Sequence, residues 1–206
     1  DSGCGTRATK ALKTDGTLWS WGRNSFGQGG LGTVVQHSSP VQIGALTTWA
    51  DLGVGSTHTA AIKTDGTLWT WGENNDGQLG HGGTIDRSSP VQVGALTDWS
   101  KVYGSNKATF ALKTNGTLWS WGIGSFGSLG HGDATNRNSP VQIGSLTTWV
   151  SFSSSSGYGT VSAINSSGQL FSWGAGYNSS IGDGLSVAHS SPVQIGTETD
   201  WTSSSS

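Results

Sequence analysis

Two histidines at matching places in the sequence have the clearest potential for metal chemistry. His81 and His131 lie 50 residues apart, and each follows Leu-Gly and precedes Gly. Imidazoles that reach the same rim of a molecule could share a divalent cation, but zinc sites need three or four ligands. No cysteine or second histidine stands at ligand spacing from either residue. We therefore expect loop histidines without a metal, and the sequence predicts no cofactor.

Glycine-rich segments and abundant serine do not add up to a catalytic site. Residues 27–32 superficially resemble a phosphate loop, but they lack the Lys-Ser/Thr pair and the strand-to-helix context that such a loop needs. No Gly-x-Ser-x-Gly elbow stands at a strand–helix junction. Asp15 and Asp65 fall in predicted turns, which makes them poor general acids. The sequence predicts a protein that is not an enzyme.

Composition excludes several classes of protein. Only 11% of the 206 residues are charged and the net charge is −2, with no cluster of Lys and Arg to bind nucleic acid. No apolar stretch approaches the roughly 18 residues of a membrane span, so we expect no membrane insertion. The single cysteine, Cys4, cannot form an internal disulfide, and it aligns with Val54 as a small apolar residue. The chain is therefore expected to be globular and non-catalytic.

The dominant feature of the sequence is a repeat of about 50 residues, present in four copies at about 1–50, 51–100, 101–150 and 151–206, with no second domain. All 11 tryptophans fall on three repeat positions, and the four prolines share a fourth. The fourth copy is two residues longer, and we place the extra residues in the serine-rich run 151–157. The aromatic residues that recur two apart are Trp19, Trp21, Trp69, Trp71, Trp119, Trp121, Phe171 and Trp173.

Each copy contains the pattern of a β-hairpin. In the second copy, two short strands at 60–64 and 67–72 flank Asp65-Gly66. An Asp-Gly pair between such strands favours a type I′ turn, which needs positive φ at both central residues. The fourth copy has serine in place of the acidic residue, so its turn is expected to be looser. The equivalent pairs are Asp15-Gly16, Asn115-Gly116 and Ser167-Gly168.

Two further strands complete the predicted unit. Residues 52–55 read as a strand whose glycines admit close approach of another backbone, and 90–93 read as an edge strand that begins at proline. Four short strands per period predict an all-β fold and specifically the blades of a β-propeller. Trp69 and Trp71 share one face of their strand, so we expect these rings to be largely buried between blades.

The segments 61–72, 77–82 and 89–91 read Ala-Ile-Lys-Thr-Asp-Gly-Thr-Leu-Trp-Thr-Trp-Gly, Gly-Gln-Leu-Gly-His-Gly and Ser-Pro-Val. This pattern resembles the repeat of the regulator of chromosome condensation family, and it recurs over the whole chain. The resemblance implies a propeller of about seven blades, of which four are present, and a histidine at position 58 that forms a hydrogen bond within its blade. The first copy departs from the pattern at Gly29 and Leu31, and the fourth copy departs from it at Ile181 and Asp183.

The family includes an exchange factor for a nuclear GTPase, a plant ultraviolet photoreceptor, a lactamase inhibitor, and bacterial and phage proteins. The photoreceptor uses tryptophans flanked by arginines, whereas only four arginines occur here, at positions 7, 23, 87 and 137. Low charge, many Gly, Ser and Thr residues and a single cysteine favour a structural or adhesive module of a virion or bacterial surface protein. An intracellular regulatory propeller that docks a protein partner is the alternative. An extracellular or virion location is favoured over the cytoplasm.

Loops that vary between copies are where binding specificity is expected, because a rigid scaffold tolerates change there. Lys13, Lys63 and Lys113 recur before the hairpin turn, with Asn165 in the fourth copy, and are interpreted as a solubilising row or, alternatively, as a rim for an anionic partner. Both chain ends stand in phase with the repeat, so further blades of the same or a neighbouring chain are expected to complete the ring, with a four-bladed ring closed on itself as the alternative. The candidate binding-loop residues are Asn24, Phe26, Asn74, Asp76, Ser125, Phe126, Tyr177 and Asn178.

Overall fold

Four antiparallel sheets of four strands each make up the protein, one sheet per repeat. The computed structural model describes residues 2–5, 7–154 and 159–203. Blade 1 contains β1 (Ser2–Gly5), β2 (Ala8–Leu12), β3 (Leu18–Gly22) and β4 (His37–Gln42). Blade 2 contains β5 (Trp49–Val54), β6 (His58–Lys63), β7 (Leu68–Gly72) and β8 (Arg87–Gln92). Blade 3 contains β9 (Trp99–Gly104), β10 (Ala108–Lys113), β11 (Leu118–Gly122) and β12 (Arg137–Gln142). Blade 4 contains β13 (Trp149–Ser154), β14 (Thr160–Asn165), β15 (Leu170–Gly174) and β16 (His189–Ile195).

The predicted all-β fold is confirmed. In the described residues, the helical segments are two short 3-10 turns, η1 (Ser125–Gly127) and η2 (Tyr177–Ser179). The side chain of Cys4 and residues 155–157 of the serine-rich run lie outside the described part of the chain, so the expectations for Cys4 and for the extra residues stay untested.

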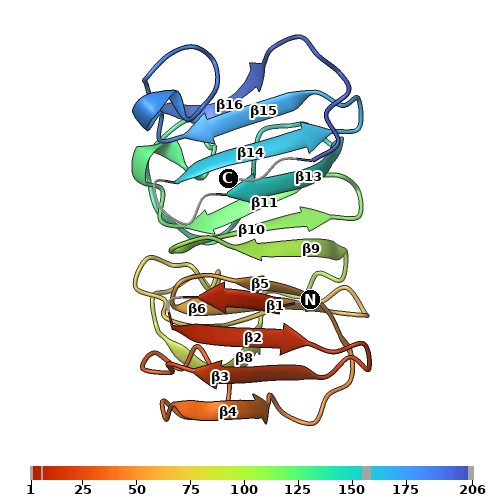
Figure 1. Cartoon of the computed structure of the whole chain (residues 1–206), viewed down its shortest axis with the longest axis vertical. Helices are drawn as coiled ribbons and strands as arrows, with labels where there is room; N and C mark the ends of the chain where they lie inside the picture. The colour runs from red at the N-terminus through yellow and green to blue at the C-terminus, as the bar shows by residue number, and fades with distance from the viewer. Residues whose placement is uncertain (1, 6, 155–158, 204–206) are drawn as a thin grey trace.

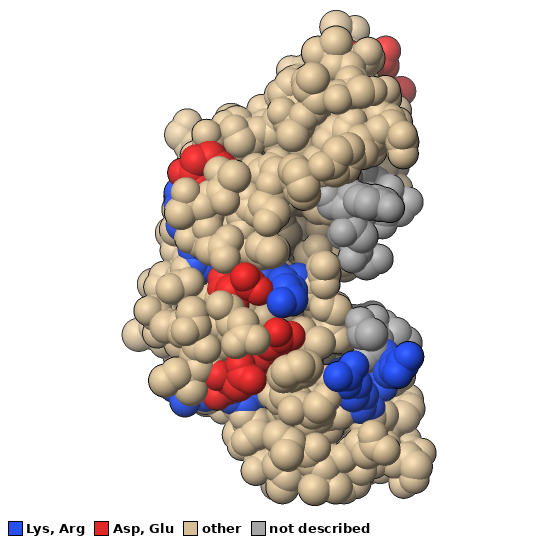
Figure 2. Space-filling model, turned by 90° about the vertical axis from the view of Figure 1, so that its left-hand side faces the viewer, with Lys and Arg blue, Asp and Glu red and all other residues tan. Residues whose placement is uncertain are grey.

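The four blades pack in series and form an arc (Figures 1 and 2). The first strands of blades 1 to 3 lie against one another, because β1 and β2 contact β5, and β5 and β6 contact β9. Blade 4 contacts blade 3 through η1, which lies against β15 and β16. Figure 2 shows that the arc is hollowed on one side. The blades therefore have the arrangement of a partial propeller.

The hairpin between the second and third strand of each blade forms at the predicted place but with a different turn. Gly66 has φ of +76°, whereas Asp65 does not have a positive φ. Gly66 donates its N–H to Lys63 carbonyl at 2.9 Å, and Lys63 donates to Thr67 carbonyl at 3.0 Å. This is a type I turn followed by a glycine bulge, so the predicted type I′ turn is wrong. The glycine supplies the only positive φ, and the serine of the fourth copy is therefore not a weakness: Gly168 has φ of +72°.

The first and last strands of each blade have the predicted positions, one in close contact with the neighbouring blade and the other at the sheet edge. Their bounds differ from the predicted ones. A Cβ on Gly53 would meet the backbone of Tyr103 and Gly104, so glycine is required where β5 and β9 approach each other. β8 pairs only with β7 and is an edge strand, but Pro90 lies within it rather than at its start. A register shift between Thr70 and Gly72 accompanies the proline, which fits its missing backbone donor.

Tryptophan side chains anchor each blade to the one before it. Trp71 is fully buried and donates its indole N–H across the blade boundary to the carbonyl of Gln28, at 3.1 Å. A buried tryptophan removes roughly 200 Å² from water, which contributes about 5 kcal/mol. Trp121 and Trp173 repeat the arrangement with the carbonyls of Gln78 and Ser128.

The other ring of each pair is partly buried. Trp69 belongs to this class, as do its equivalents and Trp21 of blade 1, and it packs against a core cluster that blades 1 and 2 share. Trp69 contacts Trp49 edge-to-face at 6.3 Å, and Trp49 itself is buried. The equivalents of Trp69 are Trp19, Trp119 and Phe171.

Candidate binding surfaces

An aromatic pair lies exposed where the loops of blades 3 and 4 meet. Phe126 and Tyr177 belong to η1 and η2, and their rings contact edge-to-face at 5.3 Å. About half of each side chain is exposed: 51% for Phe126 and 49% for Tyr177. Phe126 and Asn178 have φ of +57° and +53°, a left-handed conformation that costs non-glycine residues free energy. Ser125 and Asn178 are also exposed, so four of the predicted loop residues gather on this rim.

Asn24 and Asn74 do not belong to an exposed binding surface, which corrects the sequence-based prediction. Asn74 is 1% exposed, and its Nδ2 donates to the carbonyls of Gly83 and Ile85, at 2.9 and 3.1 Å. Its Oδ1 accepts the N–H of Leu79. Asn24 forms the same bonds in blade 1. These amides hold the loops together from inside, and nothing in their sequence position distinguishes them from the exposed residues beside them.

Phe26 and Asp76 are half-buried and take different partners. The guanidinium of Arg23 lies 5.8 Å from the ring of Phe26. Asp76 pairs with Lys107 of the next blade at 3.2 Å, and Glu73 joins the same cation at 3.5 Å. Burial would lower the pKa of Lys107, but its hydrogen bond to Asp76 and the two negative charges raise it. This network ties blade 2 to blade 3.

The histidines form hydrogen bonds and do not gather into a metal site. His81 Nε2 lies 3.0 Å from the hydroxyl of Thr70, and His131 repeats this contact with Ser120. Burial lowers the pKa of both imidazoles. Within the described part of the chain, no three residues of His, Cys, Asp or Glu are placed to hold a metal ion together.

His58 joins two blades, where the resemblance implies a bond within one blade. Its Nε2 lies 2.8 Å from the hydroxyl of Thr109, which belongs to β10 of the next blade. The side chain is fully buried, and burial lowers its pKa to about 4. The imidazole is therefore neutral at physiological pH and acts as a structural link.

The recurring lysines lie over tryptophan rings and range in side-chain exposure from 54% for Lys13 to 7% for Lys113, so they do not form a uniform solubilising row. Lys63 Nζ lies 3.6 Å from the centroid of Trp69 and 5.3 Å from that of Trp49. Lys113 repeats the arrangement with its own blade's rings at 4.6 and 4.8 Å, and its side chain is only 7% exposed. Such contacts are cation–π interactions. The sequence does carry a signal for them, because Asn165 replaces lysine in the one copy where Phe171 replaces tryptophan.

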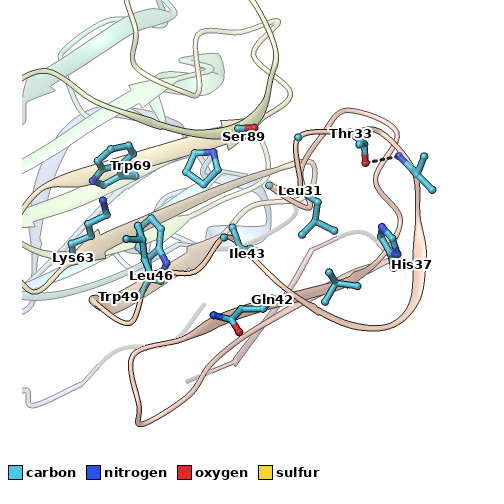
Figure 3. Close-up of a pocket in the computed structure, with 16 residues that line it drawn as sticks. Leu31, Thr33, His37, Gln42, Ile43, Leu46, Trp49, Lys63, Trp69 and Ser89 are labelled. Atoms are coloured by element: carbon cyan, nitrogen blue, oxygen red, sulfur yellow. Dashed lines mark hydrogen bonds between the residues drawn. The ribbon is translucent and has the colours of Figure 1, made fainter.

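A groove of about 830 Å³ lies between blades 1 and 2 (Figure 3). Lys63, Trp69 and Trp49 line one part of it, and Leu31 and Ile43 line another. Figure 3 shows the amine of Lys63 beside the Trp69 ring, with Leu46 close to Trp49. Nothing in the sequence analysis points to this groove, because its walls come from two different repeats.

Four antiparallel blades in an arc, with tryptophan anchors at each boundary, define a propeller built from sequence repeats. The family model of the regulator of chromosome condensation (RCC1) repeat matches residues 15–62, 65–112 and 115–161, and a second model of that repeat matches 49–78. These segments cover well over half of the chain. The protein belongs to the RCC1 repeat family.

Solved structures of this family share the fold. Human WBSCR16 is 22% identical, with a TM-score of 0.83 over 96% of this chain and 52% of its own. Yeast RCC1 (Prp20) in complex with Kap60 is 21% identical, with a TM-score of 0.81 over 96% of this chain and 48% of its own. The chain thus spans about half the length of these relatives. A segment of 39 residues, 19% of this chain and 9% of the relative, is 51% identical to the ultraviolet-B receptor UVR8 of Arabidopsis thaliana.

Proposed function

We propose that this chain is a non-catalytic propeller segment that docks a protein partner on the rim formed by η1 and η2. The observation that carries the proposal is the exposed pair of Phe126 and Tyr177, which bridges two blades. Exposed aromatic rings on a rigid support often supply most of the binding free energy in protein interfaces. Four of the loop residues singled out in the sequence, Ser125, Phe126, Tyr177 and Asn178, would contribute to this surface.

The relatives support a protein as the partner. Yeast RCC1 has been crystallised bound to Kap60, and the structure of Prp20p was described with its binding to Gsp1p and histones. These partners favour a regulatory docking role over the adhesive role in a virion or bacterial surface protein. Low charge remains the argument for the surface role, because only 11% of the residues are charged. In the described residues, no helix is both long and apolar enough to span a membrane.

The proposal is tested with the double variant Phe126→Ala/Tyr177→Ala. The matched control is Leu146→Ala, because Leu146 is 40% exposed and lies in the link between β12 and β13, at the opposite end of the strands. Quantitative affinity capture from an extract of the native organism should retain a protein with the wild type and the control and lose it with the double variant. A partner held equally by all three proteins would contradict docking on this rim. Cell fractionation of the native organism would distinguish the two roles, because the regulatory role places the protein inside the cell and the other role places it on a surface or virion.

A further inference from the structure

The groove between blades 1 and 2 has the size and lining of a small-molecule site. Its volume of about 830 Å³ lies within the roughly 300–1,000 Å³ typical of ligand pockets. The walls are mostly apolar, and Leu46 at the groove is 45% exposed. Trp69 and Trp49 offer aromatic surface against which a flat apolar molecule can pack. Figure 3 shows these rings together with Lys63 at one end of the groove.

Lys63 forms no salt bridge among the described residues, unlike the equivalent lysines. Lys13 pairs with Asp15 at 3.2 Å, and Lys113 pairs with Asp98 at 3.3 Å. Asp98, the partner of Lys113, is equivalent to Thr48 in the first copy, so Lys63 has no carboxylate at that position. The turn carboxylate of Asp65, equivalent to Asp15, interacts with Lys63 from beyond salt-bridge distance.

The next groove along the arc lacks this combination. It lies between blades 2 and 3 and has a volume of about 450 Å³. His81 lines it where Leu31 lines the first groove, and the cation beside its tryptophans is already neutralised by Asp98. In blade 4, Asn165 replaces the lysine altogether. The first groove is therefore distinct within the repeat.

We propose that the groove between blades 1 and 2 binds a small molecule with a flat apolar body and one carboxylate. The body packs against the indoles, Leu46 and Ile43, while the carboxylate pairs with Lys63 Nζ. A half-buried ammonium with no anionic neighbour within salt-bridge distance gains more from a bound carboxylate than one already paired, because the surrounding apolar groups reduce screening by water. This site is separate from the rim formed by η1 and η2, and either proposal can fail without the other.

The probe is 2-naphthoate, with the uncharged 2-naphthamide as its matched analogue. Titration calorimetry on the whole chain should give one site for the carboxylate and an affinity at least about tenfold weaker for the amide. Indole N–H resonances of Trp49 and Trp69, assigned by substitution, should shift on titration. Absence of naphthoate binding at about 1 mM, or equal affinities for the two probes, would overturn the proposal.

Two variants test the role of Lys63 from opposite directions. Lys63→Gln removes the cation, and Thr48→Asp supplies the internal partner that Lys113 already has, without changing any residue that lines the groove. Both should weaken naphthoate binding about tenfold and leave naphthamide binding unchanged. Lys113→Gln is the control and should alter neither. Because Thr48 is exposed, Thr48→Asp should fold normally, and unchanged naphthoate affinity in this variant would refute the assigned pairing.

Discussion

Tryptophans two residues apart on one strand differ in burial. Trp71 reaches the neighbouring blade and hydrogen-bonds the Gln28 carbonyl, whereas Trp69 lies at the groove under Lys63. Because side chains alternate between the two faces of a strand, both rings must lie on the same face. This alternation does not determine how much of that face the neighbouring blade covers. Burial differences of this kind translate directly into stability.

Replacement of Trp71 with alanine should cost about 3–5 kcal/mol of unfolding free energy, as for other large core aromatics. Trp69→Ala should cost less, because part of this side chain is already exposed in the folded protein. Urea unfolding of both variants measures the difference. Equal losses would contradict the burial that distinguishes the two rings.

His58 makes stability depend on pH in a defined direction. The folded protein holds the pKa of His58 at about 4, below the roughly 6.5 of an unfolded chain. The unfolded chain therefore binds the proton more readily, and the contribution of neutral His58 is lost as pH falls from about 6.5 to about 4. The loss should reach about 3 kcal/mol at the lower end.

His58→Gln isolates this effect, because His81 and His131 titrate in both proteins. Urea unfolding between pH 7 and pH 4 should show a shallower decline for the variant than for the wild type. Parallel declines would mean that His58 does not carry the dependence.

At the level of elements, single residues determine the loops and turns, either by adopting a positive φ or by hydrogen-bonding backbone carbonyls. Gly66 supplies the positive φ after the type I turn, and Asn74 satisfies the carbonyls of the long loop that follows β7. In blades 3 and 4, Gly124 and Gly176 replace this asparagine, and the loops form η1 and η2 instead. The exposed aromatic pair thus occurs where the internal amide is missing.

Gly66→Ala should destabilise the protein by more than Gly94→Ala, although both glycines have positive φ. A Cβ on Gly66 would meet the carbonyl of Thr97, whereas a Cβ on Gly94 would meet nothing within 4 Å. Gly94→Ala should cost about 1 kcal/mol for the left-handed backbone alone, and the clash at Gly66 should add to a similar cost. Chemical denaturation of the two variants tests this, and equal losses would argue against the close contact.

For the whole molecule, one tryptophan of the series differs from the others in burial. Trp49, Trp99 and Trp149 are each about 97% buried against the rings of their own blade, whereas Trp201 is 41% exposed. Trp201 still donates its backbone N–H to the carbonyl of Gly168, as Trp149 does to Gly116. Completion of the ring by further blades of the same or a neighbouring chain stays a prediction.

Trp201→Ala should change the unfolding free energy of this chain by less than about 1 kcal/mol, while Trp149→Ala should cost about 3–5 kcal/mol. The reason is that Trp149 packs on Phe171 and Trp173, at ring distances of 5.1 and 6.4 Å. Thermal and chemical unfolding at two protein concentrations provides the measurement. A large loss for Trp201→Ala that depends on concentration would show that another copy covers this residue in solution.

The features that could be predicted from the sequence are those that depend on residues close together in the chain. The 50-residue period, the hairpins at Asp-Gly pairs and the edge position of the proline strand all depend on residues close in the chain, and the structure confirms them. The turn type was mispredicted because a three-residue loop with a glycine bulge uses the same Asp-Gly pair as a type I′ turn. The burial of the Asn24 and Asn74 amides was not predicted, because polarity alone does not show which side of a loop a side chain faces.

The sequence by itself determined the repeat and the all-β class, since these follow from periodicity along one chain. Only the tertiary structure decided which rings are fully buried, that His58 reaches Thr109 across a blade boundary, and that Lys63 lies at a groove without a salt bridge to any described residue. The physical reason is that each of these features joins two repeats. Its energetics depend on the distance and angle between neighbouring blades, which no pattern within one repeat specifies.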